Sequence, residues 1–309
     1  ATVCQGASLD DLSPEAIQLF RDRWERHSGN ALLKQLSAAR LLSDAELVVN
    51  GGVTYAALVL LGTHQAMGRH LAQAEVVFEY RSREGSIEFQ QRTENRRGFL
   101  LFHDELWGTV NLRNDLFSYQ DGLYRVEVPS FNELAVREAV LNAVSHRDYR
   151  LQGSTFVKQW PTRIQIVSPG GFPSGVSPSN ILERQAPRNR RLADALARCG
   201  LVERSGQGAD RMFSTAVREA KLPPDFDQTD AYQVSVTLSG KVRDEQFLKF
   251  MSGLAKEAGE PLSLDDLLVL DAVHREQPVP ERLAARVSPL VGMGALEHAG
   301  GRKLVLSKR

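Results

Sequence analysis

Residues 132–149 limit the possible folds of this chain more than any other segment, because they read as a single helix. Glu138, Asn142 and His146 are spaced four positions apart, so their side chains stack on one side of that helix. The remainder is largely apolar, through Leu134, Val140, Leu141 and Val144. A carboxylate and a carboxamide one turn apart supply oxygen ligands for a hard cation, and the carboxylate can also orient or deprotonate a water. The same spacing also fits an amphipathic helix whose polar side simply faces solvent.

Strand patterns on both sides of this helix predict an α+β domain. Strands are expected over 154–160 and 163–167, joined by the tight link Pro161-Thr162, and a half-buried antiparallel strand over 232–238, where apolar and polar residues alternate. The other expected elements are strands over 74–80, 87–92 (a polar edge) and 123–128, and helices over 100–114, 192–199 and 208–220. A hairpin after a helix is typical of a sheet layered with helices.

The first part of the chain predicts short helices around a small turn. Ser13 is suited to cap a helix over 12–27, since Pro14 fits the first helical position. The next expected elements are a helix over 30–40, a strand over 46–49, and an apolar helix from the cap Thr54 to Leu61.

Residues 241–309 predict a separate small domain. Helices are expected over 264–275, 280–287 and 289–298, followed by a turn and strand over 300–306. Three helices and a terminal β element indicate a winged helix. The third helix offers few polar groups for reading bases, and the nearly balanced charge weakens a case based on phosphate neutralisation. Double-stranded DNA binding therefore stands beside dimerisation, as a homodimer, or domain docking as alternatives for this domain.

Composition excludes few functions, but it indicates the cellular environment of the chain. Lys plus Arg and Asp plus Glu each number 38, so zero net charge gives no global electrostatic case for nucleic acid or membrane binding. Cys4 and Cys199 lie far apart without metal-ligand spacing and are expected to be free thiols of a reducing compartment. No signal peptide and no membrane-spanning apolar run are evident, so a cytoplasmic location is expected.

Four ordered motifs resemble a known family. Glu138-x-x-x-Asn142-Ala with His146-Arg147-Asp148-Tyr149 is similar to the first nucleotide-binding box of the Bergerat-fold ATPases, which include gyrase, Hsp90, histidine kinases and MutL. More narrowly, it resembles a bacterial family of predicted transcriptional regulators often labelled RecG-related ATP-dependent DNA helicases. Residues 163–173 are similar to the family's strand followed by an Asn-Pro-Gly-Gly-Leu-Pro loop. Arg188-Asn189 resembles the family's Arg-Asn pair, and residues 200–212 resemble its Gly-x-Ile-Glu-x-x-Gly-x-Gly-x-x-Arg-Met segment.

The resemblance is close over residues 126–240 and implies a fold and a domain order. It implies a Bergerat-type α/β sandwich over 73–240, with helices on one face of a mixed or antiparallel sheet. A helical connecting segment over 1–72 would precede it, and the winged-helix-like domain over 241–309 would follow. Relatives usually carry a Schlafen-type AlbA_2 domain before the connecting segment, and this chain starts at Ala1 without one.

The resemblance also implies roles for individual residues. Glu138 would be catalytic by orienting or deprotonating the attacking water, Asn142 would bind Mg²⁺ that bridges the ATP phosphates, and His146 would be the next polar position. Further nucleotide-binding residues would be Ser168, Gly170, Gly171, Arg188, Asn189, Gly206, Gly208 and Arg211. Glycines before a helix let the backbone and the positive helix end approach a phosphate. Residues 173–180 would take the place of a mobile lid.

Ser168 departs from the pattern. Bergerat ATPases place an aspartate here to accept the adenine amino group, and relatives of this family place an asparagine. A hydroxyl can accept one such hydrogen bond but lacks the charge-assisted strength of a carboxylate. A simple Pro-Gly turn after the strand explains Ser168 to Gly171 almost as well.

These observations leave two functions open. The first is an ATP-binding transcriptional regulator, with or without weak ATP hydrolysis, in which nucleotide closure acts on the winged helix. The resemblance implies ATP and Mg²⁺ for this function. The alternative is a non-enzymatic DNA-binding or dimerising regulator on a degenerate ATPase scaffold. A true helicase is not expected, because the chain has no Gly-x-x-x-x-Gly-Lys-[Ser/Thr] phosphate loop.

Overall fold

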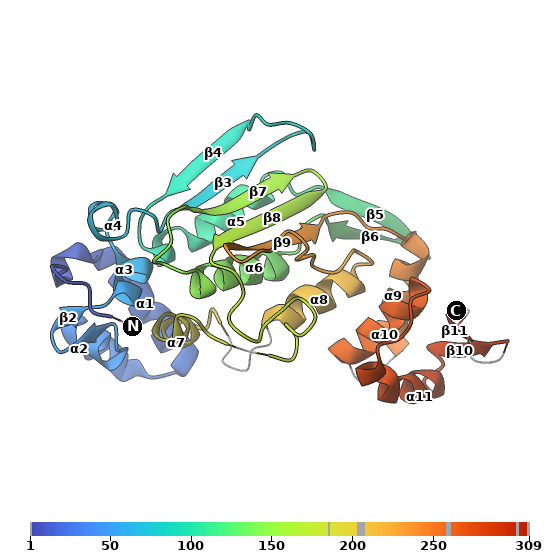
Figure 1. The fold of residues 1–309 in the computed structure, drawn as a ribbon. Coiled ribbons are helices and arrows are strands. Elements are labelled where there is room, and N and C mark those ends of the chain that lie inside the picture. Colours follow the sequence, from blue (N-terminus) through green and yellow to red (C-terminus); the bar gives the residue numbers. More distant parts are fainter. Residues whose placement is uncertain (1, 185, 203–207, 258–260, 301–302, 308–309) are drawn as a thin grey trace.

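A computed structural model of the chain describes residues 2–184, 186–202, 208–257, 261–300 and 303–307. Over these residues the fold is α+β, with eleven α-helices and a five-stranded mixed sheet. The sheet lies in the middle of the molecule, the first helices lie on one side of it, and the last helices lie on the other (Figure 1). Every helix in this part of the chain lacks the length and apolar character needed to cross a membrane.

The central sheet has the strand order β4-β3-β7-β8-β9. Its strands are β3 (Val76–Tyr80), β4 (Gln91–Asn95), β7 (Thr155–Trp160), β8 (Arg163–Pro169) and β9 (Gln233–Ser239). β3 and β7 are parallel, and every other neighbouring pair is antiparallel. The hairpin across Pro161-Thr162 and the alternating strand beside it are confirmed. The edge strand β4 is confirmed as an edge, although it begins later than the predicted 87–92.

One face of the sheet is covered by helices. Along β8, Ile164, Ile166 and Ser168 are buried while the residues between them are half-buried, so a single face packs inward. α5 (His103–Asn111), α6 (Glu133–His146) and α8 (Gly208–Arg218) lie on that face (Figure 1).

α6 corresponds to the helix predicted over residues 132–149, which we call the signature helix. Its polar side does not face bulk water. Asn132 caps it, because its side chain accepts a hydrogen bond from the backbone N–H of Leu134 at 3.0 Å. Glu138 is only 5% exposed, whereas Leu134, expected among the apolar packing residues, is 61% exposed. The interpretation of a solvent-facing polar stripe is therefore wrong.

The first part of the chain consists of short, separately capped elements. They are η1 (Leu9–Asp11), α1 (Pro14–Ser28), η2 (Ala31–Gln35), α2 (Ala38–Asp44), β1 (Val48–Val49), β2 (Gly52–Val53), α3 (Tyr55–Leu61) and α4 (His64–His70). The predicted caps Ser13 and Thr54 are confirmed. The single helix predicted over 30–40 is wrong, because Asn30 and Ser37 each cap a separate short element.

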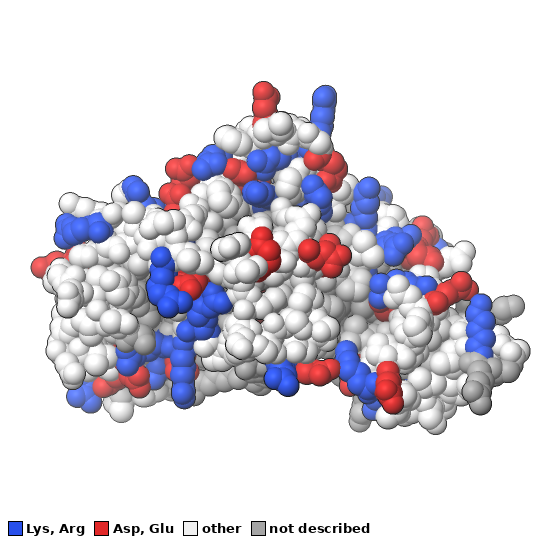
Figure 2. All heavy atoms as spheres, viewed as in Figure 1, with Lys and Arg blue, Asp and Glu red and all other residues white. Residues whose placement is uncertain are grey.

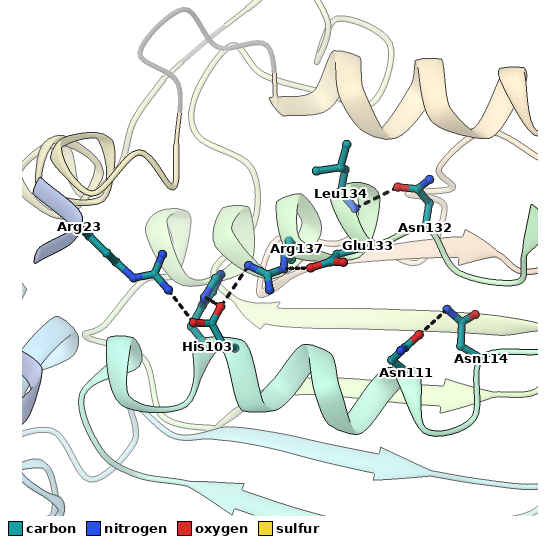
Figure 3. Close-up of polar contacts among 9 residues, drawn as sticks. Arg23, His103, Asn111, Asn114, Asn132, Glu133, Leu134 and Arg137 are labelled. Carbon is teal, nitrogen blue, oxygen red and sulfur yellow. Dashed lines mark hydrogen bonds and ion pairs between the residues drawn. The ribbon is translucent and has the colours of Figure 1, made fainter. Parts of the chain in front are cut away.

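An ionic network joins this first part to the signature helix. η3 (Phe99–Leu101) leads into α5, and Asp104 of α5 pairs with Arg23 of α1 at 2.6 Å and with Arg137 of α6 at 3.2 Å. Figure 3 shows the guanidinium groups of Arg23 and Arg137 approaching His103 from opposite sides. His103 is 3% exposed, and burial lowers its pKa to about 4. The imidazole is therefore neutral inside the fold.

The chain also forms a hairpin that stands apart from the main sheet. The predicted strand over 123–128 is β6 (Tyr124–Pro129), and it pairs with an unpredicted strand, β5 (Leu116–Asp121). Tyr119 and Val128 belong to a hydrophobic cluster with the last helices, not to the cluster beneath the sheet.

The last part of the chain contains α9 (Glu245–Glu257), α10 (Leu264–His274), η4 (Glu281–Leu283), α11 (Ala284–Gly292), β10 (Leu296–Ala299) and β11 (Lys303–Leu306). β10 and β11 form an antiparallel hairpin. The helix predicted over 289–298 is wrong: α11 ends at Gly292, and Gly294 adopts φ +66°, which turns the chain into β10. We call α9 to β11 the C-terminal unit.

Candidate functional site

A cavity of about 420 Å³ lies between α6, the ends of β8 and β9, the start of α8 and α7 (Arg190–Arg198). Its volume is within the range of small-molecule pockets. Seven residues predicted from the motifs line it: Glu138, Asn142, His146, Ser168, Gly170, Gly171 and Gly208. Segments far apart in the sequence therefore meet around one space.

Glu138 and Asn142 form the polar wall contributed by α6. Asn142 donates from Nδ2 to Glu138 Oε1 at 3.2 Å. The side-chain carbonyl oxygen of Asn142 is not used in this bond and can accept from, or coordinate, a ligand. Burial raises the pKa of Glu138, and the nearby charge of Arg211 and the Asn142 hydrogen bond partly oppose this rise. A buried carboxylate with a raised pKa is a stronger base than an exposed one.

The start of α8 presses directly on Glu138. An ideal Cβ placed on Gly208 would lie 2.7 Å from Glu138 Cδ, so only glycine allows this approach without a shift. Arg211 is half-buried on the same helix and does not line the cavity, but its charge acts on Glu138. Gly206 lies outside the described residues.

His146 lies at the other end of the polar face, where its neutral form is favoured. Burial lowers its pKa, the charge of Arg188 lowers it further, and a backbone hydrogen bond with Ala186 acts in the opposite direction. His146 therefore connects α6 to the segment that precedes α7.

Ser168 and the two glycines after it form the wall on the sheet side. Ser168 donates its hydroxyl proton to the Ala143 carbonyl at 2.8 Å, so its oxygen can only accept hydrogen bonds from a ligand. Gly170 adopts φ +98°, which a glycine tolerates. The Gly170 and Gly171 N–H groups donate to the carbonyls of Tyr232 and Ala231 at 2.6 and 3.3 Å, so these glycines shape the cavity rather than offering free donors.

Arg188 and Asn189 lie behind the cavity walls and do not line this cavity. Arg188 donates from Nη2 to the Gly171 carbonyl at 2.5 Å, and it borders a more open hollow on the far side of the Gly170-Gly171 turn. Asn189 donates from Nδ2 to the carbonyls of Ser145 and Arg147 at 3.0 and 2.7 Å, near the end of α6. The two residues therefore hold the walls in place.

The rest of the His146-Arg147-Asp148-Tyr149 motif is structural. Arg147 is buried and donates to the carbonyls of Asp148 and Gln73 at 2.8 and 2.7 Å. Asp148 pairs with Arg150 at 2.7 Å, and this bond lowers the pKa of Asp148 to about 2.

Sequence reasoning missed the wall formed by α7 and the segment before it. Arg184, Arg190 and Asp194 bring three charges to the cavity. Ala193 and Ala197 complete the same face of α7, so the spacing of Arg190, Ala193, Asp194 and Ala197 is the signal that could have identified it. Figure 2 shows Lys and Arg side chains, with Asp and Glu side chains among them, on the surface near α7 and the loops beside it.

Much of the cavity lining is apolar. Ile166, Val234 and Val236 of the sheet lie in its lining, together with Met212 of α8 and the aromatic Phe226. An apolar lining that also carries a few polar groups suits a ligand with a flat apolar part and a charged part.

Comparisons with known proteins bear on part of this site. Residues 155–238 match a family model described as "Putative ATP-dependent DNA helicase recG C-terminal", HATPase_c_4, which supports the resemblance to RecG-related ATPases over that range. Glu138, Asn142 and His146 precede the matched range. Residues 1–77 match a model described as a domain of unknown function, DUF8451. No curated protein matches the chain.

A solved structure shares the fold. The crystal structure of the DIP2311 protein from Corynebacterium diphtheriae is similar with a TM-score of 0.75 at 23% sequence identity. The likeness covers 99% of this chain and 63% of that one, so this chain spans less than two thirds of that protein's length. At this identity the likeness concerns the fold alone.

Proposed function

We propose that the chain is an ATP-binding regulator of the RecG-related ATPase type, with a Bergerat-type nucleotide site in the cavity. The observation that carries this proposal is the meeting of Glu138, Asn142, Ser168 and Gly208 around one cavity. The family match over residues 155–238 supports the same kind of site.

The apolar lining and Ser168 would hold the base. Because the Ser168 hydroxyl donates to Ala143, its oxygen presents only acceptor capacity, which fits an amino group and does not fit a carbonyl. The site would therefore select adenine over a base with a carbonyl at the same position. A neutral hydroxyl gives this selection less strength than a carboxylate would.

The polar end of the cavity would hold the phosphates. The N-terminus of α8 begins at Gly208 beside Glu138, and a helix start with a glycine favours close approach of a phosphate. Arg184 and Arg190 would add positive charge from the opposite wall. Bound Mg²⁺ would neutralise charge on the phosphates, and Asn142 is the residue that would coordinate it.

Glu138 would act as the general base. Its raised pKa and its position against the start of α8 suit a carboxylate that accepts a proton from an attacking water. We infer slow turnover, because the base is deeply buried and Gly208 packs against it.

For the C-terminal unit we propose a winged-helix-like role in transcriptional regulation. Its three helices and its β10–β11 hairpin fit that architecture. DNA contact through α11 has less support, because Arg286 is already bound to Asp266 by two hydrogen bonds of 2.9 Å. Contact with a second copy of the chain is the competing role for this unit.

The alternative, a non-enzymatic regulator on a degenerate scaffold, is favoured by one observation. The hydroxyl of Ser168 and the N–H groups of Gly170 and Gly171 are already used inside the protein. Thermal unfolding with and without Mg²⁺-ATP separates the two functions, since a ligand at a hundred times its Kd adds about 2.7 kcal/mol of stability. No shift at millimolar ATP would refute nucleotide binding. Glu138→Ala should still bind ATP and should not hydrolyse it.

A further inference from the structure

Two neighbouring charged residues before α7 face different parts of the molecule. We call residues 172–187 the lid segment, of which all but residue 185 are described. Arg184 lines the cavity. Glu183 instead forms an ion pair with Arg282 of the C-terminal unit, with 3.2 Å between Oε1 and Nε. Since these residues are adjacent in the chain, holding Glu183 also restricts where Arg184 lies.

Within the lid segment, hydrogen bonds form a local turn around Asn180. Its side chain accepts from the Ser177 N–H at 2.8 Å and donates to the Gly175 carbonyl at 3.0 Å, and its backbone carbonyl accepts from Arg184 N–H at 2.9 Å. These bonds shape the segment but do not fix it to another element. The hydrogen bond between Ala186 and His146 ties the segment to α6, and the pair between Glu183 and Arg282 ties it to the C-terminal unit.

Arg282 lies among carboxylates on the other side as well. Its Nη1 is 3.6 Å from Asp265 Oδ1 at the start of α10. Burial and the nearby charge of Asp265 raise the pKa of Asp210, which belongs to α8. Arg282 therefore lies between Glu183 of the lid segment and Asp265 of α10, and its positive charge offsets these two carboxylates.

We propose that Arg282 is a positioning residue for the cavity: through Glu183 it holds the lid segment so that Arg184 faces an anionic ligand. The identity of that ligand, Mg²⁺-ATP, rests on the proposed function. Because binding effects are reciprocal, a nucleotide that engages Arg184 also acts on the C-terminal unit through Arg282. The pair is partly exposed, with Arg282 at 40% and Glu183 at 53%, so its effect is a few-fold and depends on salt.

The first test needs no nucleotide. In the full chain, Arg282→Gln is expected to speed tryptic cleavage after Arg184 about two- to fivefold at low salt, with the difference shrinking at high salt. Arg286→Gln is the matched control, because Arg286 is similarly exposed at 41% but pairs with Asp266 instead of the lid segment. An unchanged rate in Arg282→Gln, or an equal increase in both variants, overturns the proposal.

The second test uses Mg²⁺-ATP as the probe. Arg282→Gln and Glu183→Gln should each weaken binding about two- to fivefold, and the double variant should be no weaker than either single variant. Fully additive losses would contradict action through the pair. If the wild-type chain does not bind Mg²⁺-ATP, the proposed function fails, while the cleavage rates still decide whether Arg282 holds the lid segment.

Discussion

Substituting Gly208 with alanine tests the contact between α8 and Glu138. In an unobstructed helix, glycine to alanine gains about 1 kcal/mol of stability. Here the added Cβ would lie 2.7 Å from Glu138 Cδ, so the buried carboxylate must move and its 3.2 Å bond with Asn142 is disturbed. Overpacking of this kind costs about 1–3 kcal/mol. We therefore expect Gly208→Ala to lower the free energy of unfolding by up to about 2 kcal/mol.

Urea unfolding of the full chain measures this loss, and two companions identify its cause. Gly253 lies in α9 with nothing within 4 Å of an added Cβ, so Gly253→Ala should gain about 0.5–1 kcal/mol. In a Glu138→Ala background the obstacle is gone, and Gly208→Ala should then be stabilising as well. If Gly208→Ala is at least as stable as the wild type while Glu138 is present, the close contact is refuted.

Four other outcomes are expected. Glu138→Gln should raise the free energy of unfolding at neutral pH, because the raised pKa of Glu138 means that the fold disfavours its charged form. Urea unfolding at pH 7 measures this change, and a less stable variant would contradict the prediction. Burial lowers the pKa of His103 from an ordinary 6.5 to about 4. Its contribution to stability is therefore present above pH 6.5, and about 3 kcal/mol of it is lost as the pH falls toward 4. His103→Gln should flatten this part of the pH–stability curve. Ser168→Ala should bind ATP several-fold more weakly and lose any preference for ATP over ITP, which competition binding tests. Asn189→Ala removes two hydrogen bonds near the end of α6 and should cost about 1–3 kcal/mol, and an unchanged urea midpoint would contradict that role.

Local signals in the sequence were enough to locate most of the elements around the cavity. The tight link Pro161-Thr162 between β7 and β8 and the glycine that begins α8 act within a few residues, so they can be read from the sequence. The approach of Gly208 to Glu138 was expected only through the resemblance, because nothing in local spacing brings these two segments together.

Other features depended on contacts that the sequence pattern does not contain. β5 and β6 pair with each other instead of joining the sheet, because their apolar side packs on the C-terminal unit. The sequence does not distinguish Arg188 and Asn189 as ligand contacts from residues that support the cavity walls. Their hydrogen bonds to backbone carbonyls show that they support the walls. The spacing of Arg190 and Asp194 places them on one face of α7, but what that face meets depends on tertiary packing.

The two ends of α8 contact different parts of the protein, and this limits where residues can be inserted or deleted. Its first turns contribute Gly208 and Met212 to the cavity, while Val217 belongs to the other hydrophobic cluster and Arg218 donates to the Leu262 carbonyl at 2.8 Å. Removing or adding one residue inside the helix turns one end against the other by about 100°. Both ends could not then keep their neighbours. Single-residue insertions and deletions should therefore be tolerated far better in exposed loops, such as the one between β3 and β4, than anywhere between Met212 and Val217.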